Sequence, residues 1–206
     1  MTPHAATTAS AIDAAAATLA RGGLVVFPTE TLYGLGADAS NPAALQHLVD
    51  LKGREAGKPI LVLISDIAML NTLVTEIPPL AARLMRRFWP GPLTLVLPAQ
   101  PSVSEILTGG GDGIGVRLSS HPIATALVRA LGRPVTAPSA NPAGQPAPVE
   151  LQQARAYFGD RVDDYLDGGR LHGAPSTVAD VRGELQVIRE GAIAMEDLHA
   201  TLREPE

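Results

Sequence analysis

Short apolar runs alternate with amphipathic helical patterns along the whole chain, and this alternation restricts the possible folds more than any other feature. Residues 10–21 and 80–88 carry apolar side chains at helical spacing, whereas residues 24–27 and 93–97 are short β-branched or aliphatic runs bounded by glycine or proline. Strand candidates separated by helices are typical of α/β domains. Because no repeat or linker-like segment interrupts the alternation, we expect a single α/β domain.

The same apolar patterns predict the remaining helices and strands. The sequence predicts further helices at 42–52, 123–131 and 151–158, and further strands at 60–64, 114–118, 134–137, 177–181 and 185–189. We expect residues 29–36, which follow Pro28 and contain two glycines, to form a loop. The order of the strands within the sheet cannot be read from this pattern.

Charge and composition exclude several classes of function. Sixteen Lys and Arg against 21 Asp and Glu give a net charge of −5, which argues against broad nonspecific attraction to nucleic acid. The absence of cysteine removes thiol catalysis, disulfides and cysteine metal sites. The five histidines form no i,i+4 pair, and the seven aromatic residues are too dispersed to stack single-stranded bases. We therefore expect no metal site built from protein side chains.

The sequence contains no signal for a membrane. Its longest apolar runs are far shorter than the roughly 20 residues that span a bilayer. The first ten residues lack both the basic region and the apolar block of a secretion signal. We therefore expect a cytoplasmic protein without membrane contact.

The common phosphate-binding fingerprints are absent. No GxxxxGK[ST] motif occurs, and the glycine cluster at 109–115 does not match GxGxxG at any offset. We expect that cluster to be a flexible connection before a strand. If the protein binds a nucleotide, residues outside these two fingerprints contact the phosphates.

Polar side chains follow several of the predicted strands. Thr29 and Thr31 come after the first strand, Arg117 lies near the end of another, and Ser139 and Asn141 follow a third. Ligands of open α/β sheets gather at such strand ends, so these side chains are candidates for the walls of one site. Taken singly, each also fits a local role, as a turn or cap residue or as a surface ion pair.

Three cations cluster within seven residues of this acidic chain. Lys52 ends a predicted helix, Gly53 stops it, and Arg54 and Lys58 follow. Because the helix stops at Gly53, Lys52 and Arg54 are free to converge on one anion. The alternative is that Lys52 complements the helix C-terminus while Arg54 and Lys58 are solvated. The cluster favours a phosphate site without deciding between these possibilities.

Six motifs occur in order along nearly the whole chain: FPTETLYGLG at 27–36, KGR at 52–54, WPGPLT at 89–94, GVR at 115–117, SAN at 139–141 with Gly144, and Ser176-Thr177. Together they make the chain resemble the YrdC/Sua5/TsaC family, the threonylcarbamoyl-AMP synthases. The resemblance implies a single YrdC-like α/β domain with an open, twisted mixed sheet flanked by helices. We expect that domain at residues 8–194, a C-terminal helix or tail at 195–206, and the short form of the family without the linker and second domain of the longer Sua5 type.

The resemblance also implies a reaction. L-Threonine, bicarbonate or CO2, and ATP would yield threonylcarbamoyl-AMP and pyrophosphate, with water when bicarbonate is the source, as the first step of t6A formation at position 37 of tRNA. Because the threonine amine forms a carbamate unaided and that carbamate attacks the α-phosphorus, no protein nucleophile is needed. Catalysis then depends on alignment and on neutralising phosphate charge, with Mg²⁺ arriving with ATP. The implied downstream partners are the TsaB/TsaD/TsaE-type transfer machinery.

Matching the motifs position by position assigns individual roles. The resemblance implies catalytic roles for Lys52 and Arg54, nucleotide contacts at Lys52, Arg54, Lys58, Ser139, Asn141 and Arg189, and threonine contacts at Thr31, Arg117 and Ser176. No residue is assigned to a metal. One position departs from the pattern, since Leu63 stands where longer relatives often have a threonine-binding histidine.

Other functions remain open at this stage. A non-catalytic RNA-binding module could contact tRNA through Arg83, Arg86 and Arg87, although a solvated helix face is the favoured explanation of these residues. A carbamoyl-adenylate step of the kind found in hydrogenase maturation would need zinc-finger cysteines, and this chain has none. A paralogue with a degenerate SxN loop is disfavoured by the intact Ser139 and Asn141.

Overall fold

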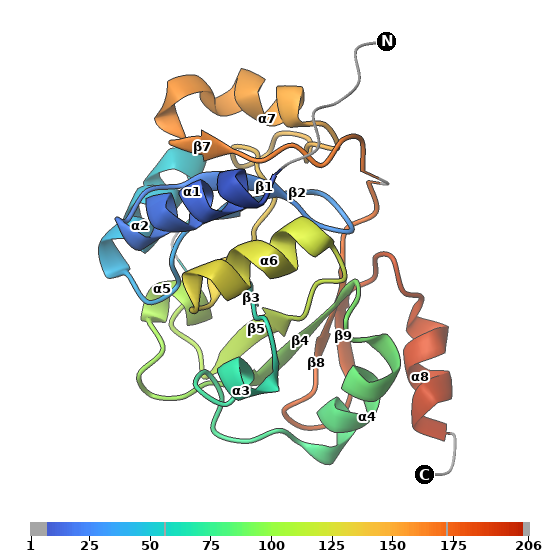
Figure 1. The fold of residues 1–206 in the computed structure, drawn as a ribbon. Coiled ribbons are helices and arrows are strands. Elements are labelled where there is room, and N and C mark those ends of the chain that lie inside the picture. Colours follow the sequence, from blue (N-terminus) through green and yellow to red (C-terminus); the bar gives the residue numbers. More distant parts are fainter. Residues whose placement is uncertain (1–7, 56, 172, 204–206) are drawn as a thin grey trace.

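A computed structural model describes residues 8–55, 57–171 and 173–203 of the chain (Figure 1). The helices are α1 (Ala9–Ala20), α2 (Pro42–Lys52), α3 (Ile67–Leu70), α4 (Pro79–Phe88), α5 (Glu105–Thr108), α6 (Pro122–Leu131), α7 (Leu151–Phe158) and α8 (Met195–Arg203), with a 3-10 turn η1 (Gly159–Arg161). The strands are β1 (Val25–Pro28), β2 (Tyr33–Gly36), β3 (Val62–Leu63), β4 (Leu93–Pro98), β5 (Gly113–Arg117), β6 (Val135–Thr136), β7 (Asp164–Tyr165), β8 (Thr177–Asp180) and β9 (Gln186–Arg189). The helices expected from periodicity are confirmed, each within one or two residues of its predicted ends.

Local signals in the sequence set the ends of α2. The side chain of Asn41 accepts hydrogen bonds from the backbone N–H groups of Ala43 and Ala44, and Pro42 occupies the first turn. Gly53 ends the helix in a left-handed conformation with φ of 58°. The chain therefore turns sharply between Lys52 and Arg54.

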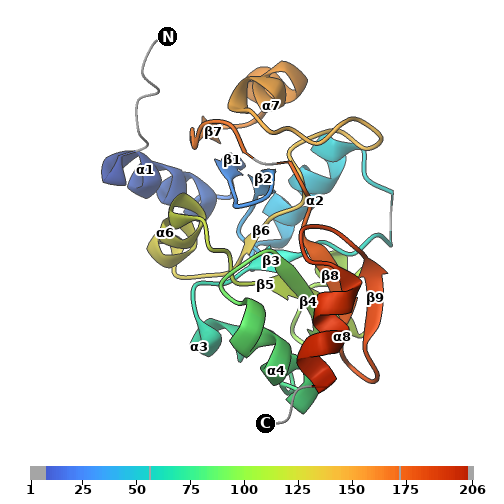
Figure 2. The same ribbon diagram turned by 90° about the vertical axis from the view of Figure 1, so that its right-hand side faces the viewer.

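The strands form two mixed sheets (Figure 2). The smaller sheet has the order β2-β1-β7, in which β1 pairs antiparallel with β2 and parallel with β7. The larger sheet has the order β6-β3-β5-β4-β8-β9, with parallel pairs β3-β5 and β4-β8 and antiparallel pairs elsewhere. This arrangement confirms the α/β class with open mixed sheets flanked by helices, and it divides the strands between two sheets where one was expected.

The segment 134–140 joins the two sheets. Its residues 135–136 form β6 at the edge of the larger sheet, while its backbone also bonds to β2 and the residues that follow it. Leu35 N–H donates to Pro138 O at 2.8 Å, and Thr136 N–H donates to Ala37 O at 3.0 Å. Ser139 consequently lies beside β2, directly across from Gly34.

The loop expected at residues 29–36 is wrong for its second half, which forms β2. Pairing of Phe27 with Gly34 and of Val25 with Gly36 closes a hairpin. This strand was not predicted from the sequence because it contains two glycines, and glycine is rare in strand interiors. Here it permits close packing, since a Cβ at Gly36 would lie 3.0 Å from the Phe27 ring and 3.1 Å from Val135.

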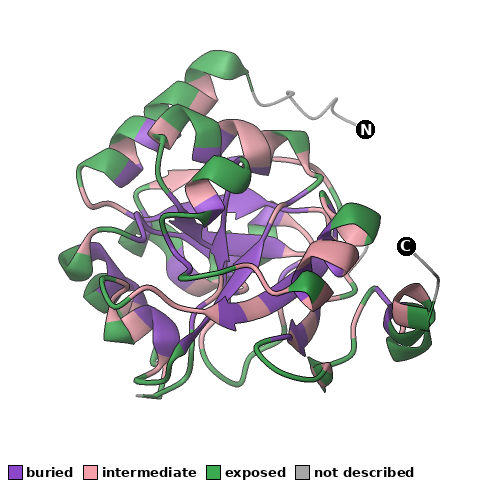
Figure 3. Cartoon of the chain, turned by 90° about the horizontal axis from the view of Figure 1, so that it is seen from below, coloured by how far each residue is buried: buried purple, intermediate pink, exposed green. Residues whose placement is uncertain are grey.

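Helices cover the sheets and enclose the core, and their outer faces are exposed (Figure 3). Helices α1 and α6 pack side by side, and Leu19 and Leu127 beneath them are buried with Phe27 of β1. Helix α8 packs on α4, and its Leu198 belongs to the main core. The domain boundary that we expected at residue 194 stays a prediction.

Other differences from the expected elements are local. The strand expected at 60–64 is confined to Val62–Leu63, and the short elements α3, α5 and β7 have too few residues to show a periodicity. Among the helices that the structure describes, none has the length and apolar character to cross a membrane.

Candidate active site

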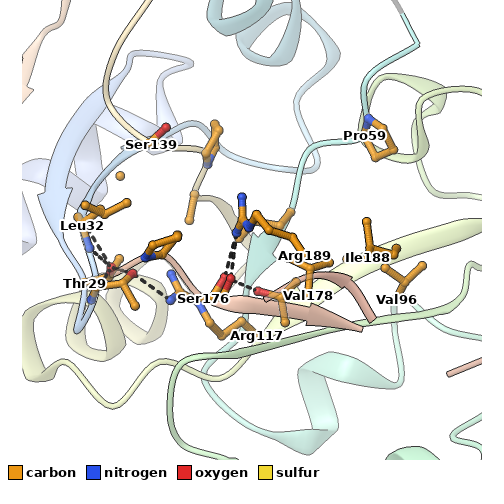
Figure 4. Close-up of a pocket in the computed structure, with 18 of the residues that line it drawn as sticks. Thr29, Leu32, Pro59, Val96, Arg117, Ser139, Ser176, Val178, Ile188 and Arg189 are labelled. Atoms are coloured by element: carbon orange, nitrogen blue, oxygen red, sulfur yellow. Dashed lines mark hydrogen bonds between the residues drawn. The ribbon is translucent and has the colours of Figure 1, made fainter. Parts of the chain in front are cut away.

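A cavity of about 650 Å³ lies over one face of the larger sheet (Figure 4). Alternate residues of three neighbouring strands line it: Thr94 and Val96 on β4, Gly113, Gly115 and Arg117 on β5, and Val178 and Asp180 on β8. Because successive side chains point to opposite faces, the intervening Leu95, Ile114 and Val116 are buried in the core. Arg117, a candidate for the wall of a site at the strand ends, lines this cavity.

The second wall comes from loops of the smaller sheet. Thr29 and Thr31 lie in the turn between β1 and β2, and their hydroxyl oxygens are 2.9 Å apart. Thr29 also donates its hydroxyl hydrogen to Leu32 O at 2.7 Å, which fixes the turn. Ser139 adds the segment that joins the two sheets.

Arg117 is held in the cavity wall by the β1–β2 turn. Its Nη1 donates to Glu30 Oε1 at 3.0 Å and to Thr31 Oγ1 at 3.1 Å. The Ser119 hydroxyl donates to the other oxygen of the Glu30 carboxylate. Arg117 is 2% exposed, and its Nε has no hydrogen-bond partner among the described residues. The guanidinium is therefore fixed in place with donor capacity left unused.

The electrostatics around Arg117 favour an anion. Burial lowers the pKa of Arg117, the Glu30 carboxylate opposes that shift, and the nearby Arg189 lowers the pKa further. An arginine stays charged despite such shifts, because its ordinary pKa lies far above neutral pH. Near Arg117, the charges of Arg117 and Arg189 outweigh that of the Glu30 carboxylate, and a carboxylate ligand can offset the excess.

Ser176 and Arg189 form the next part of the wall. The Ser176 Oγ lies 2.9 Å from Thr94 Oγ1, and Arg189 Nη2 donates to Ser176 O at 2.9 Å (Figure 4). Ser176 directly precedes β8, and Arg189 ends its neighbour β9, so strand pairing brings the two together. Burial lowers the pKa of Arg189.

The three clustered cations have three different environments. Arg54 lines the cavity, where its Nη2 donates to Pro59 O at 2.6 Å and its Nε donates to Lys58 O at 3.3 Å. Lys58 itself pairs with Glu55 at 2.8 Å, with 55% of its side chain exposed, and is not among the residues lining the cavity. Lys52 is 4% exposed, and its Nζ donates to two backbone carbonyl oxygens, Ser139 O and Asn141 O, at 2.5 Å each.

Asn141 stabilises its own loop. Its side-chain nitrogen donates to Pro142 O at 3.0 Å and to Gln145 O at 2.6 Å. Its side-chain oxygen is buried and has no hydrogen-bond partner in the part of the chain that the structure describes. The amide is thus fixed at one end and retains an unused acceptor at the other.

Comparison with known proteins identifies the family. The family model for Sua5, YciO and YrdC proteins, described as "Telomere recombination", matches residues 17–191. The chain belongs to the Sua5/YciO/YrdC family. It is 40% identical over 195 residues to the threonylcarbamoyl-AMP synthase of Pyrococcus abyssi, which covers 94% of this chain and 57% of that protein. The chain therefore spans little more than half the length of that relative.

A further relative and a solved structure are also similar. The threonylcarbamoyl-AMP synthase of Thiobacillus denitrificans is 41% identical over 165 residues, which cover 79% of this chain and 87% of that protein. The crystal structure of P. abyssi Sua5 complexed with L-threonine superimposes with a TM-score of 0.92 at 39% identity, covering 96% of this chain and 58% of that chain.

The structure brings together most of the site residues predicted from the family motifs. Six of them line the cavity: Thr31, Arg54, Arg117, Ser139, Ser176 and Arg189. Lys52 and Asn141 do not line the cavity, but the Lys52 ammonium and the Asn141 backbone N–H both donate to Ser139 O. Lys58 pairs with Glu55 and does not line the cavity either. Leu63, at the position where longer relatives often have a histidine, is buried in the core under α1 and α6 and does not line the cavity.

Sequence reasoning missed several residues of this family site. Glu30 lies inside the FPTETLYGLG motif, but nothing in the sequence showed that it pairs with Arg117. The sequence also did not show that three charged residues line the other end of the cavity, where Arg182 bonds to Asp180 and Asp112. The expected flexible connection at 109–115 is wrong in part, because Gly109 caps α5 and Gly113 belongs to β5. Among the described residues, no three His, Asp or Glu side chains gather as metal ligands.

Proposed function

We propose that this protein is an L-threonylcarbamoyladenylate synthase, a nucleotidyltransferase that acts on L-threonine, bicarbonate or CO2, and ATP. The observation that carries the proposal is the buried Arg117, which keeps unused donor capacity in a cavity that Arg54 and Arg189 also line. A fixed guanidinium suits a carboxylate, and additional arginines suit phosphates. The similarity to two synthases and to a threonine-bound relative supports the same assignment.

The threonine would lie at the Arg117 end of the cavity. Its carboxylate would accept hydrogen bonds from Arg117, and Thr31 and Ser176 would contact its polar groups. Glu30 and Thr31 already hold the guanidinium, so little ordering is left to occur when the ligand binds. The threonine amine would then face the middle of the cavity.

The nucleotide would occupy the part of the cavity lined by Arg54, Ser139 and Arg189. The amine nitrogen attacks CO2 and loses a proton, which gives a carbamate; when bicarbonate is the source, water is also released. A carbamate oxygen then attacks the α-phosphorus of ATP, and pyrophosphate leaves with the bonding electrons. Mg²⁺ would enter as part of the nucleotide substrate and neutralise phosphate charge.

This chain's own residues would act by alignment and charge neutralisation. The arginines would stabilise negative charge that builds up on the phosphoryl oxygens in the transition state. We expect nucleotide contacts also from Lys58 and Asn141, which would require Lys58 to leave its exposed pair with Glu55. The product is a mixed anhydride, which suits rapid transfer in the cytoplasm to TsaB/TsaD/TsaE-type machinery that modifies tRNA.

The test is pyrophosphate release by the purified protein. We expect release from ATP and Mg²⁺ only when L-threonine and bicarbonate are both present, with a much weaker response to L-serine. Arg117→Met should raise the KM for L-threonine far more than the KM for ATP, because it removes the carboxylate partner alone. No pyrophosphate release under any of these conditions, together with salt-dependent tRNA binding, would instead support a non-catalytic RNA-binding module.

A further inference from the structure

Lys52 connects the end of α2 to the segment 139–143 from inside the protein. Its Nζ donates to Ser139 O and to Asn141 O, at 2.5 Å each. Its own carbonyl oxygen accepts a hydrogen bond from Ala143 N–H at 2.8 Å. Side chain and main chain of one residue therefore bind three points on a five-residue segment.

The opposite side of that segment is bound to β2. Ala140 N–H donates to Tyr33 O at 2.8 Å, and Leu35 N–H donates to Pro138 O at 2.8 Å. Between these bonds and Lys52, Ser139 is left half-buried with its side chain at the cavity. The position of Ser139 thus depends on β2 from one side and on Lys52 from the other.

Resting on the proposed function, we infer that Lys52 is a positioning residue that shapes the nucleotide site through the Ser139–Asn141 backbone, rather than a ligand of the phosphates. Backbone carbonyl oxygens carry partial negative charge and would repel a phosphate. The ammonium group of Lys52 binds two of them at once and offsets that charge. The segment can then present a hydroxyl group toward an anion without presenting its carbonyl oxygens.

The contrast with Arg54 supports this division of roles. Lys52 is 4% exposed and does not line the cavity, whereas Arg54 lines it. Two of the three ammonium hydrogens of Lys52 are already committed to carbonyl oxygens at short distance. The two cations of one motif therefore have different roles: Arg54 lines the cavity, and Lys52 fixes the backbone of the segment that contains Ser139.

Hydrogen exchange on the protein without ligand tests the positioning role alone. The variants are Lys52→Met, which removes the donor and the charge, and Lys52→Gln, which keeps two N–H donors without the charge; Arg54→Met is the control. We expect exchange at Ala140 and Ala143 to quicken by about tenfold or more in Lys52→Met, to return toward the native rate in Lys52→Gln, and to stay unchanged in Arg54→Met.

ATP binding by calorimetry on the same proteins completes the test. We expect Lys52→Met to lose affinity, Lys52→Gln to regain a large part of it, and Arg54→Met to lose affinity with the segment undisturbed. Native exchange rates in Lys52→Met, with ATP affinity lost equally in Lys52→Met and Lys52→Gln, would overturn the inference and make Lys52 a direct phosphate ligand. If the native protein bound no ATP, the proposed function would fail, while the exchange rates would still decide the positioning role. Should Lys52→Met not fold, the comparison of Lys52→Gln with the native protein decides it.

Discussion

Truncating Glu30 should destabilise the protein strongly, because Arg117 would keep its charge in a buried place without a partner. Arg117 is 2% exposed, and its Nη1 donates to Glu30 Oε1 at 3.0 Å. In Glu30→Ala, only the bond to Thr31 would remain of the contacts formed by Nη1. Removing one member of a buried ion pair costs about 3–5 kcal/mol of unfolding free energy.

The lower end of that range applies here. The side chain of Glu30 is 13% exposed, and the adjoining cavity admits water that can solvate part of the freed guanidinium. We therefore expect a loss of about 3 kcal/mol, which includes the hydrogen bond from Ser119 to Glu30. With a urea m-value of about 2–3 kcal/mol/M, the midpoint should fall by about 1–1.5 M.

The assay is urea unfolding followed by circular dichroism, with a matched control on the surface. Glu55→Ala also removes a carboxylate from an ion pair, but its partner Lys58 is 55% exposed, so we expect no measurable shift of the midpoint. A Glu30→Ala midpoint equal to that of Glu55→Ala would refute the reasoning that Arg117 is a buried charge held by Glu30.

Three further predictions follow from other parts of the structure. Arg54→Ala should lower kcat/KM for ATP by about 100-fold or more with an unchanged urea midpoint, because the side chain faces the cavity. Burial lowers the pKa of Lys52 to about 8 from 10.5, so the unfolded chain binds this proton more tightly than the folded protein does. The free energy of unfolding should therefore rise by about 3 kcal/mol as the pH increases from about 8 to 10.5. Urea titrations should show this rise in the native protein and not in Lys52→Met. Gly36→Ala should cost about 1–3 kcal/mol in the same urea assay, since the new Cβ would press on Phe27 and Val135, and an unchanged midpoint would contradict the packing.

Periodicity was sufficient to predict the α/β class and most elements. The pattern that predicted helix 42–52 worked because its signals are local: Asn41 caps the start and Gly53 the end. Strand β2 was not predictable in the same way, because the close approach that favours glycine at position 36 comes from the Phe27 ring across the hairpin. Such a contact exists only after pairing. The division into two sheets depends likewise on segment 134–140, which bonds to both.

The candidate site shows the same limit. The sequence predicted Arg117, Thr31 and Ser139 as walls of one site at the strand ends, and all three line the cavity. The sequence could not show that Glu30, 87 positions away, would hold Arg117. Nor could it separate the roles of Lys52 and Arg54, since both are cations of one short motif and their surroundings exist only in the folded chain.

The most direct test of the central claim is the fate of the carbon of bicarbonate. The purified protein would be incubated with ATP, Mg²⁺, L-threonine and ¹³C-bicarbonate, and the nucleotide products would be analysed by mass spectrometry. We expect a threonylcarbamoyl-adenylate that carries the label, formed in step with pyrophosphate and strongly reduced in Arg117→Met. ATP turnover without label in any adenylate, or no adenylate at all, would contradict the proposed synthase activity.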